Sequence, residues 1–287
     1  MLFLFLLIGF VRGDSISNEK FFFKNYEFVH SFKHPRVRLS LSERSTKARD
    51  PQPLQFRAPR RYHRRLQPRK LPSRWTDTEF DWREEVRLPD PHHQLSNECF
   101  AEAASTTLTA LWQTLFEDFE TSYFDPDALV KCAGDIPGKT ALPEDVFEIK
   151  EAVSPEHTCH THNNEKAMLL AEPLVLCDLW DSVNIENELM DLLKLAPVSV
   201  GLPSTNPAFL NYHSGVLEIK HVDTPSGAPD HAVALVGFGE ENGTPYWTIR
   251  NSWGKDWGEL GYARIERKDD GSGVLGSYAS VTTATPV

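Results

Sequence analysis

Apolar residues between Cys99 and Phe119 recur at spacings of three and four, the pattern of one face of an α-helix. This is the strongest helical signal in the chain, and it predicts a helix of about five turns. Weaker helical patterns cover 144–153 and 184–195. The first half of the chain after residue 70 is therefore predicted to be mainly helical.

From Pro197 onward the pattern changes to short runs of apolar, β-branched and aromatic residues, which are typical of strands. Helices followed by strands predict an α+β protein with a helical lobe over about 71–196 and a β lobe over about 197–287. Turn residues such as Glu241-Asn242-Gly243 separate the runs. The predicted strands are 198–200, 216–219, 232–236, 246–249 and 262–265.

The N-terminal quarter differs from the rest in composition and charge. Residues 1–13 contain an apolar run that is too short to span a bilayer comfortably, so they predict a signal peptide, with an ordinary helix as the alternative. Residues 14–70 carry 15 Lys/Arg and 5 Asp/Glu, whereas residues 71–287 carry 14 and 36. Opposite charges on neighbouring segments predict that the first binds the second, more weakly in salt.

The basic segment 14–70 is predicted to be a propeptide and linker. It contains paired basic residues at Arg60-Arg61, Arg64-Arg65 and Arg69-Lys70, which suit processing proteases, and we place the mature boundary near Leu71. A nucleic-acid-binding arm is the alternative, but no helix-turn-helix or aromatic-spaced signature accompanies the charge. No nucleic-acid partner and no membrane span are therefore expected.

Three residues distant in sequence have the chemistry of a nucleophile, a base and an orienting amide. Cys99 precedes the long helix, where the helix dipole and a protonated imidazole would lower the pKa of its thiol. Two carboxylates close in sequence, Glu98 and Glu102, would act against that shift. His231 lies 132 residues downstream as the base, and Asn251 would accept a hydrogen bond from its ring. An inert buried cysteine and an ordinary core histidine are the alternatives.

These residues and their surroundings resemble the papain family of cysteine peptidases. The resemblance rests on Asp230-His231-Ala232-Val233, on Asn251-Ser252-Trp253-Gly254, and on Phe80-Asp81-Trp82-Arg83 after Leu71-Pro72. It implies a two-lobed fold with a helical lobe packed on an antiparallel, barrel-like β lobe, and an inhibitory propeptide. It also implies Cys99, His231, Asn251 and Gln94 as catalytic residues, Gln94 helping to hold the oxyanion.

The resemblance also implies a pocket and a disulfide. Ala232 would line the pocket for the substrate residue two before the scissile bond, and Ser280 would form its floor, which suggests an apolar preference. Cys132 would pair with Cys159, and pairing with Cys177 is the alternative. Family members usually have Gln-Gly-x-Cys-Gly-Ser-Cys-Trp around the nucleophile, whereas the segment from Gln94 to Phe100 is one residue shorter.

The histidine pair at residues 92–93 and the histidines at 157, 160 and 162 lack spaced partner ligands, so no metal and no cofactor are expected. Two functions fit the pattern. The first is a secreted or lysosomal cysteine endopeptidase, made as a zymogen and acting on protein or peptide substrates. The second is a papain-fold binding protein with little turnover, which the altered segment before Phe100 favours.

Overall fold

The computed structural model describes residues 72, 74–76, 78–94, 98–119, 122–133, 142–149, 151–156, 166–177, 185–219, 229–268, 275 and 278–287. The predicted signal peptide (1–13) and basic propeptide (14–70) lie outside the described residues. Cys159 and the side chain of Cys177 also lie outside them. The domain boundaries near residues 71 and 196 therefore stay predictions.

Helix α1 (Cys99–Phe116) is the central helix of the fold. Every residue from Cys99 to Gln113 is buried, so this helix belongs to the core on all sides. The Thr107 hydroxyl donates a hydrogen bond to the carbonyl oxygen of Pro197 at 2.8 Å. This contact attaches the helix to the start of strand β4 (Val198–Leu202).

The large sheet has the strand order β3-β9-β4-β6-β7-β8-β5 among the described residues, and β1 pairs with β6 beside this path. All of these pairs are antiparallel except β5–β8, which is parallel. Strands β2 and β10 form a separate antiparallel pair. The remaining strand bounds are β1 Phe80–Asp81, β2 Met168–Leu170, β3 Leu174–Cys177, β5 Val216–Leu217, β6 His231–Glu241, β7 Thr244–Arg250, β8 Tyr262–Glu266, β9 Tyr278–Val281 and β10 Ala284–Pro286.

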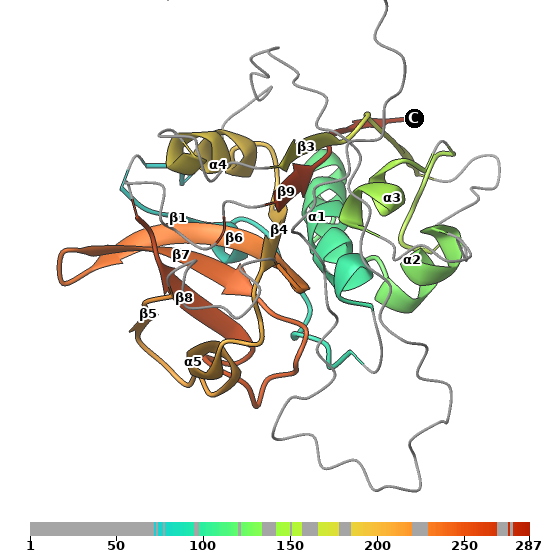
Figure 1. The fold of residues 1–287 in the computed structure, drawn as a ribbon. Coiled ribbons are helices and arrows are strands. Elements are labelled where there is room, and N and C mark those ends of the chain that lie inside the picture. Colours follow the sequence, from blue (N-terminus) through green and yellow to red (C-terminus); the bar gives the residue numbers. More distant parts are fainter. Residues whose placement is uncertain are drawn as a thin grey trace, which may run out of the picture.

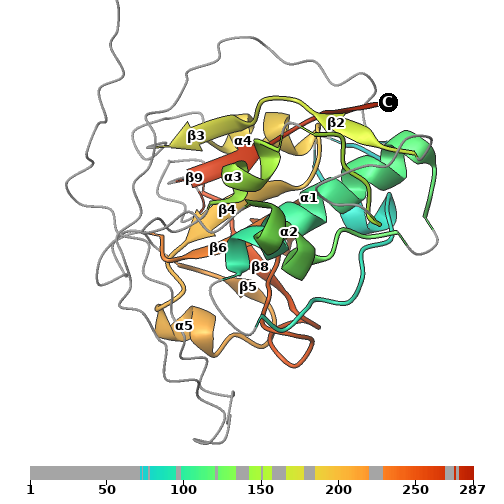
Figure 2. The ribbon, with the colours of Figure 1, turned by 90° about the vertical axis from the view of Figure 1, so that its right-hand side faces the viewer.

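Helix α1 lies between the large sheet and two of the smaller helices, α2 (Pro126–Ala133) and α3 (Pro143–Phe147). It contacts β4 and β6 on one side and α2 and α3 on the other (Figure 1). Figure 2 shows α2 and α3 in front of α1, with the large sheet behind it. Helix α4 (Ile185–Leu193) contacts β4 and β6, while η1 (Trp82–Glu84) and α5 (Pro207–Leu210) are short. The predicted α+β architecture is confirmed.

The short strand β1 brings the N-terminal part of the described chain onto the large sheet. Phe80 pairs with Phe238 and Asp81 with Gly237. A Cβ atom at Gly237 would collide with the carbonyl oxygen of Phe80, so this close pairing requires glycine. The Trp82 indole then donates to the carbonyl oxygen of Leu193 at 3.0 Å. Segments far apart in the sequence thus share one core.

The predicted helix at 99–119 and the predicted strands after residue 197 are confirmed, with shifted ends. The predicted helix over 144–153 is shorter than expected. It ends at Phe147, and Val153 instead exchanges backbone hydrogen bonds of 2.9 Å with Met168. The pattern did not predict β1, β2, β3, β9, β10, α2 or α5 as elements.

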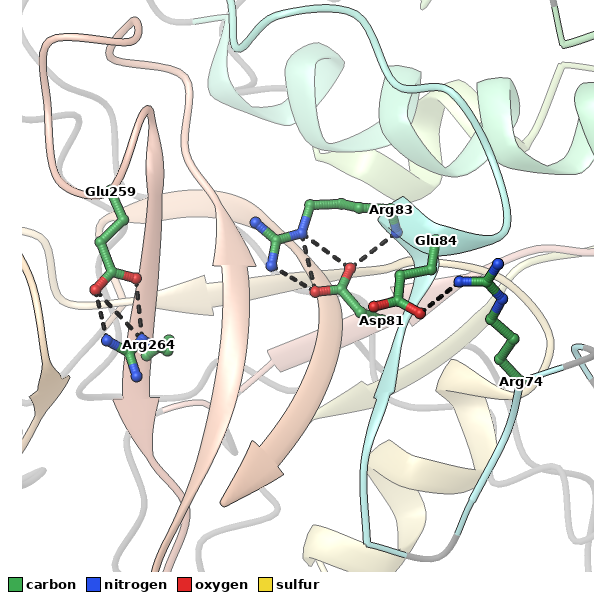
Figure 3. Close-up of polar contacts among 6 residues, drawn as sticks. All are labelled: Arg74, Asp81, Arg83, Glu84, Glu259 and Arg264. Atoms are coloured by element: carbon green, nitrogen blue, oxygen red, sulfur yellow. Dashed lines mark hydrogen bonds and ion pairs between the residues drawn. The ribbon is translucent and has the colours of Figure 1, made fainter. Parts of the chain in front are cut away.

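Ion pairs hold the segments that surround the sheet (Figure 3). Asp81 accepts from the Arg83 backbone N–H at 2.8 Å and from its guanidinium, which lies 4.6 Å from the ring centroid of Tyr262. Arg264 donates to Glu259 through two nitrogens, at 3.0 and 2.7 Å. Glu259 also accepts from the Gly215 N–H at 3.0 Å. These contacts fix the loop that precedes β8.

Two further observations bear on the sequence-based predictions. No helix in the described part of the chain is long and apolar enough to cross a membrane. Cys132 is disulfide-bonded, and its partner lies outside the described side chains. The choice of Cys159 over Cys177 therefore stays a prediction.

We expect Leu108→Ala to lower the free energy of unfolding by about 2–5 kcal/mol. Leu108 lies in the middle of α1 with 0% exposure, so the substitution removes apolar contacts and leaves a cavity in the core around the helix. Urea unfolding followed by circular dichroism measures the change. Thr114→Ala on the exposed side of the same helix is the control, with an expected change within about 0.5 kcal/mol. Equal stability of the two variants would contradict a core role for α1.

Candidate active site

Cys99 is the first residue of α1 and is only 1% exposed. Its side chain packs with Ala103, one turn later, and with Ala232 of β6. The backbone N–H groups of Ala232 and Phe100 donate to the sulfur. Because Ala232 directly follows His231, the helix and the strand bring the predicted nucleophile and the predicted base to one place.

The pKa of Cys99 differs from the sequence-based expectation. Burial raises the pKa of the Cys99 thiol to about 12, because no water solvates the thiolate. The N–H groups of Ala232 and Phe100 lower this pKa, whereas the carboxylates of Asp230 and Glu102 raise it further. The expected lowering depended on a protonated imidazole as well as on the helix dipole, and without that positive charge burial outweighs the donors at the helix N-terminus. A thiolate here requires a balancing positive charge.

His231 is the first residue of β6, and Asn251 directly follows β7, the neighbouring strand. The Nε2 atom of His231 lies 2.8 Å from Oδ1 of Asn251, and both side chains are buried. The same Oδ1 atom accepts the backbone N–H of Ser252 at 2.8 Å, so it is an oxygen. Nε2 must therefore carry the hydrogen, which leaves Nδ1 of a neutral ring available to accept a proton.

Aromatic rings enclose this histidine–asparagine contact. The Trp253 ring stacks on the His231 ring with a centroid distance of 5.0 Å and an interplanar angle of 23°. Trp253 in turn packs edge-on against Phe209 and Trp257, each at 5.4 Å. Excluding water from the hydrogen bond strengthens it and holds the imidazole in one orientation.

Gln94 is attached to the same loop as Asn251. Its backbone N–H donates to the carbonyl oxygen of Ser252 at 2.9 Å, and the Ser252 hydroxyl donates to its Oε1. Because Oε1 of Gln94 accepts this hydrogen bond, the side-chain amide nitrogen is the atom of Gln94 that can donate to an oxyanion. Ser252 was not predicted as a site residue, although its place between Asn251 and Trp253 was a usable signal.

The two predicted pocket residues occupy different parts of the sheet. Ala232 contacts Cys99 directly. Ser280 is fully buried on β9, where it pairs with Ser199 of β4 and lies 2.9 Å from the Tyr278 hydroxyl. The Tyr278 hydroxyl also donates to the Glu144 carboxylate of α3. Ser280 thus has polar neighbours, and its role at the pocket floor stays a prediction.

Asp230, the acidic residue before His231, has a structural role in the turn after β4. Asp230 accepts hydrogen bonds from the backbone and side chains of Ser204 and Thr205, in the turn after β4. Burial raises the pKa of Asp230, and these donors partly offset that rise. Asp230 therefore fixes the approach of the chain to β6. Among the residues that the structure describes, no group of three or more His, Cys, Asp or Glu side chains is placed to hold a metal ion.

This geometry agrees with the family comparison. The model of the papain family cysteine proteases matches residues 76–283, which is most of the chain. The chain therefore belongs to the papain family of cysteine proteases. The family match contains the helix with Cys99, the strand with His231 and the loop with Asn251.

Individual relatives are similar over parts of their length. A viral cathepsin of Epiphyas postvittana nucleopolyhedrovirus is 29% identical over 212 residues, which are 70% of this chain and 63% of the relative. The oryzain gamma chain of Oryza sativa subsp. japonica is 48% identical over 91 residues, which are 30% of this chain and 25% of the relative. The matches thus cover less than two thirds of these relatives.

Solved structures of the family have the same fold. Bromelain from Ananas comosus, in complex with the E64 inhibitor, aligns with a TM-score of 0.57 and 25% identity over 72% of this chain and 99% of its own. Digestive procathepsin L2 from the larval midgut of Tenebrio molitor aligns with a TM-score of 0.58 and 26% identity, over 74% and 69%. The papain-like architecture predicted from the sequence is confirmed.

We expect Asn251→Ala to lower the free energy of unfolding by about 1–3 kcal/mol, because it leaves the buried donors of His231 and Ser252 without their shared acceptor. Urea unfolding measures this loss. The control Lys255→Ala removes an exposed ion pair with Asp90 and should change stability by less than about 1 kcal/mol. Wild-type stability in Asn251→Ala would show that the hydrogen bond contributes little.

Proposed function

We propose that the protein is a cysteine endopeptidase that hydrolyses peptide bonds through Cys99, His231, Asn251 and Gln94. The observation that carries this proposal is the contact of the Cys99 sulfur with the Ala232 N–H, next to a histidine whose Nε2 is bound by Asn251. With Nε2 held by the amide, Nδ1 is the ring atom left for the thiol proton. Membership of the papain family supports the same reaction.

In the proposed reaction, His231 takes the thiol proton and the thiolate attacks the carbonyl carbon of the substrate. A carbon–sulfur bond forms, and the carbonyl electrons move to the oxygen, where the Gln94 amide and the Cys99 N–H stabilise the negative charge. When this intermediate collapses, the carbon–nitrogen bond breaks and His231 gives its proton to the leaving amine. Water then hydrolyses the thioester by the reverse sequence of proton transfers.

The high pKa of Cys99 affects how this mechanism starts. Since burial disfavours an isolated thiolate, proton transfer to His231 must accompany or precede its formation. The resulting imidazolium is positive, and because Ala232, which directly follows His231, packs against Cys99, we expect the two charges to form together. Asn251 is well suited to hold that imidazolium, because a neutral amide orients the ring without adding a charge.

The site of action proposed from the sequence is the secretory pathway, with secretion or delivery to an acidic vesicle, and the substrates are proteins or peptides. The basic segment 14–70 would act as an intramolecular inhibitor until it is removed. The Tenebrio molitor relative is a procathepsin, and a further relative, the Amb a 11 protease of ragweed pollen, was solved in its proform. A propeptide mechanism is thus consistent with the fold.

A second function is supported by a specific observation. The thiol of Cys99 is 1% exposed and its pKa is raised to about 12, which favours an inert side chain. On this basis the chain would be a papain-fold binding protein with little turnover. The two functions differ in one measurable property, the reactivity of Cys99 near neutral pH.

We expect an epoxide thiol probe to label Cys99 between pH 5 and 7, with hydrolysis of peptide substrates over the same range. Cys99→Ala should abolish both, and His231→Ala should lower the hydrolysis rate by about 10²- to 10⁴-fold, the usual contribution of a general base. His213→Ala, at an exposed histidine of the β lobe, is the matched control and should retain activity. Mass spectrometry of labelled peptides and a fluorogenic assay are the measurements. An inert Cys99 would favour the binding protein.

We also expect the peptide 14–70 to inhibit the mature enzyme more weakly at pH 4 than at pH 7, by tenfold or more. The peptide carries 15 basic residues, and acid protonates the carboxylates of the 71–287 segment that attract it. Inhibition constants at the two pH values give the comparison. A peptide with Arg60, Arg61, Arg64 and Arg65 changed to glutamine should bind less tightly at pH 7. An inhibition constant that is the same at both pH values would argue against charge-controlled release.

A further inference from the structure

A buried carboxylate lies one helical turn from Cys99. Glu102 is on α1, three residues after the cysteine, and is only 9% exposed. Residues three apart on a helix are neighbours on the same face, so its charge acts on the thiol. The Glu102 carboxylate is in fact one of the groups that raise the pKa of Cys99. A peptidase that needs a thiolate would be impeded by this charge unless another group balances it.

His92 is placed to balance the charge. Its Nδ1 atom lies 2.7 Å from Oε1 of Glu102, and its side chain is 54% exposed, against 8% for that of Glu102. The carbonyl oxygen of His92 accepts the Gly254 N–H at 3.0 Å, so its backbone is held beside the loop of Trp253. The pair therefore joins α1 to the segment that carries Gln94.

The other charged groups around the pair are few. Arg250, a buried residue of β7, faces Glu102 and donates to the carbonyl oxygen of Asp90 at 3.1 Å. Glu98 faces Glu102 from the start of α1. Asp125 and Asp127, at the start of α2, raise the pKa of His92 through their charges, while Tyr262 and Asp90 act in the same direction on the pKa of Arg250. Among the groups named around the pair, His92 has the ordinary pKa nearest to neutral.

We propose that His92 and Glu102 control the ionisation of Cys99: protonated His92 cancels the negative charge that Glu102 otherwise exerts on the thiol. Both are positioning residues in this proposal, since they act through the charge state of Cys99. This proposal rests on the proposed peptidase function, because it assigns a role to the charge state of the nucleophile.

The pH range follows from the pair itself. Hydrogen bonding to Glu102 raises the pKa of His92 above its ordinary value of 6.5, although partial burial acts in the opposite direction. Burial raises the pKa of Glu102 as well, despite His92 and Arg250, because its side chain is far less exposed than that of His92. Both groups therefore hold their protons more firmly in the folded protein. The charge balance is complete below about pH 6.5 and is lost as the pH rises through the folded pKa of His92.

The test is the pH dependence of Cys99 alkylation by iodoacetamide between pH 4 and 9, measured by mass spectrometry of the Cys99 peptide. Glu102→Gln keeps the size of the side chain and removes its charge, so alkylation should be faster, on the order of tenfold, above the folded pKa of His92, where the wild-type carboxylate is unbalanced. His92→Gln leaves the carboxylate unbalanced below that pKa as well, so alkylation in this lower range should slow by on the order of tenfold. The double variant should match Glu102→Gln, because His92 acts only through Glu102.

Asp191→Asn, at an exposed carboxylate on α4, is the control for net charge and should leave the alkylation profile unchanged. Circular dichroism confirms that each variant is folded at each pH. Identical alkylation profiles in all variants, with hydrolysis intact in the wild type, overturn this proposal and leave the peptidase function standing. A wild-type Cys99 that is not alkylated at any pH overturns the peptidase function and this proposal together.

Discussion

The packing of α1 against the large sheet is the constraint on which the candidate site depends. Cys99 begins the helix and His231 begins β6, and nothing in the local sequence brings them together. The helix does so by packing on β4 and β6 along one side, within a core in which Leu108 is fully buried. Since the helix is rigid, that packing also places its first residue. The packing of the hydrophobic core therefore fixes the position of Cys99.

The same packing opposes ionisation of the Cys99 thiol. A thiol that is held by close contact with Ala103 and Ala232 is also cut off from water, which opposes its ionisation. Asp230 and Glu102 add negative charge nearby, while the backbone N–H groups of Ala232 and Phe100 act in the favourable direction. Positive charge has to come from histidine. His231 provides it directly, and the contact of His92 with Glu102 removes part of the opposing charge.

Much of the fold was predictable because its main helix and strands have clear patterns of apolar residues in their own sequence. The helix from Cys99 and the strands after Pro197 have strong periodic patterns, and they are found where predicted. Strand β1 has two residues and exists only because Phe80 and Asp81 pair with β6, so no local pattern could indicate it. The helix predicted to reach residue 153 is likewise shorter than expected, because Val153 forms backbone hydrogen bonds with Met168, which is distant in sequence.

The candidate site was predictable in its residues but not in its electrostatics. Resemblance to a family identified Cys99, His231, Asn251 and Gln94, and the structure places the last three around one loop. The burial that raises the pKa of the Cys99 thiol could not be predicted, because burial is a property of the packed fold. Glu102 was recognised as an opposing charge, whereas its contact with His92 crosses from one segment to another and leaves no pattern.

The two proposed control mechanisms, release of the segment 14–70 and balancing of the Glu102 charge by His92, both favour activity at lower pH. Acid weakens the attraction between the basic segment 14–70 and the acidic remainder of the chain, because carboxylates gain protons. Acid also keeps His92 protonated, which offsets Glu102 beside the nucleophile. One process uncovers the site and the other favours its thiolate. On the proposed function, both the attraction of the basic segment to residues 71–287 and the opposing charge of Glu102 would therefore be smallest at acidic pH.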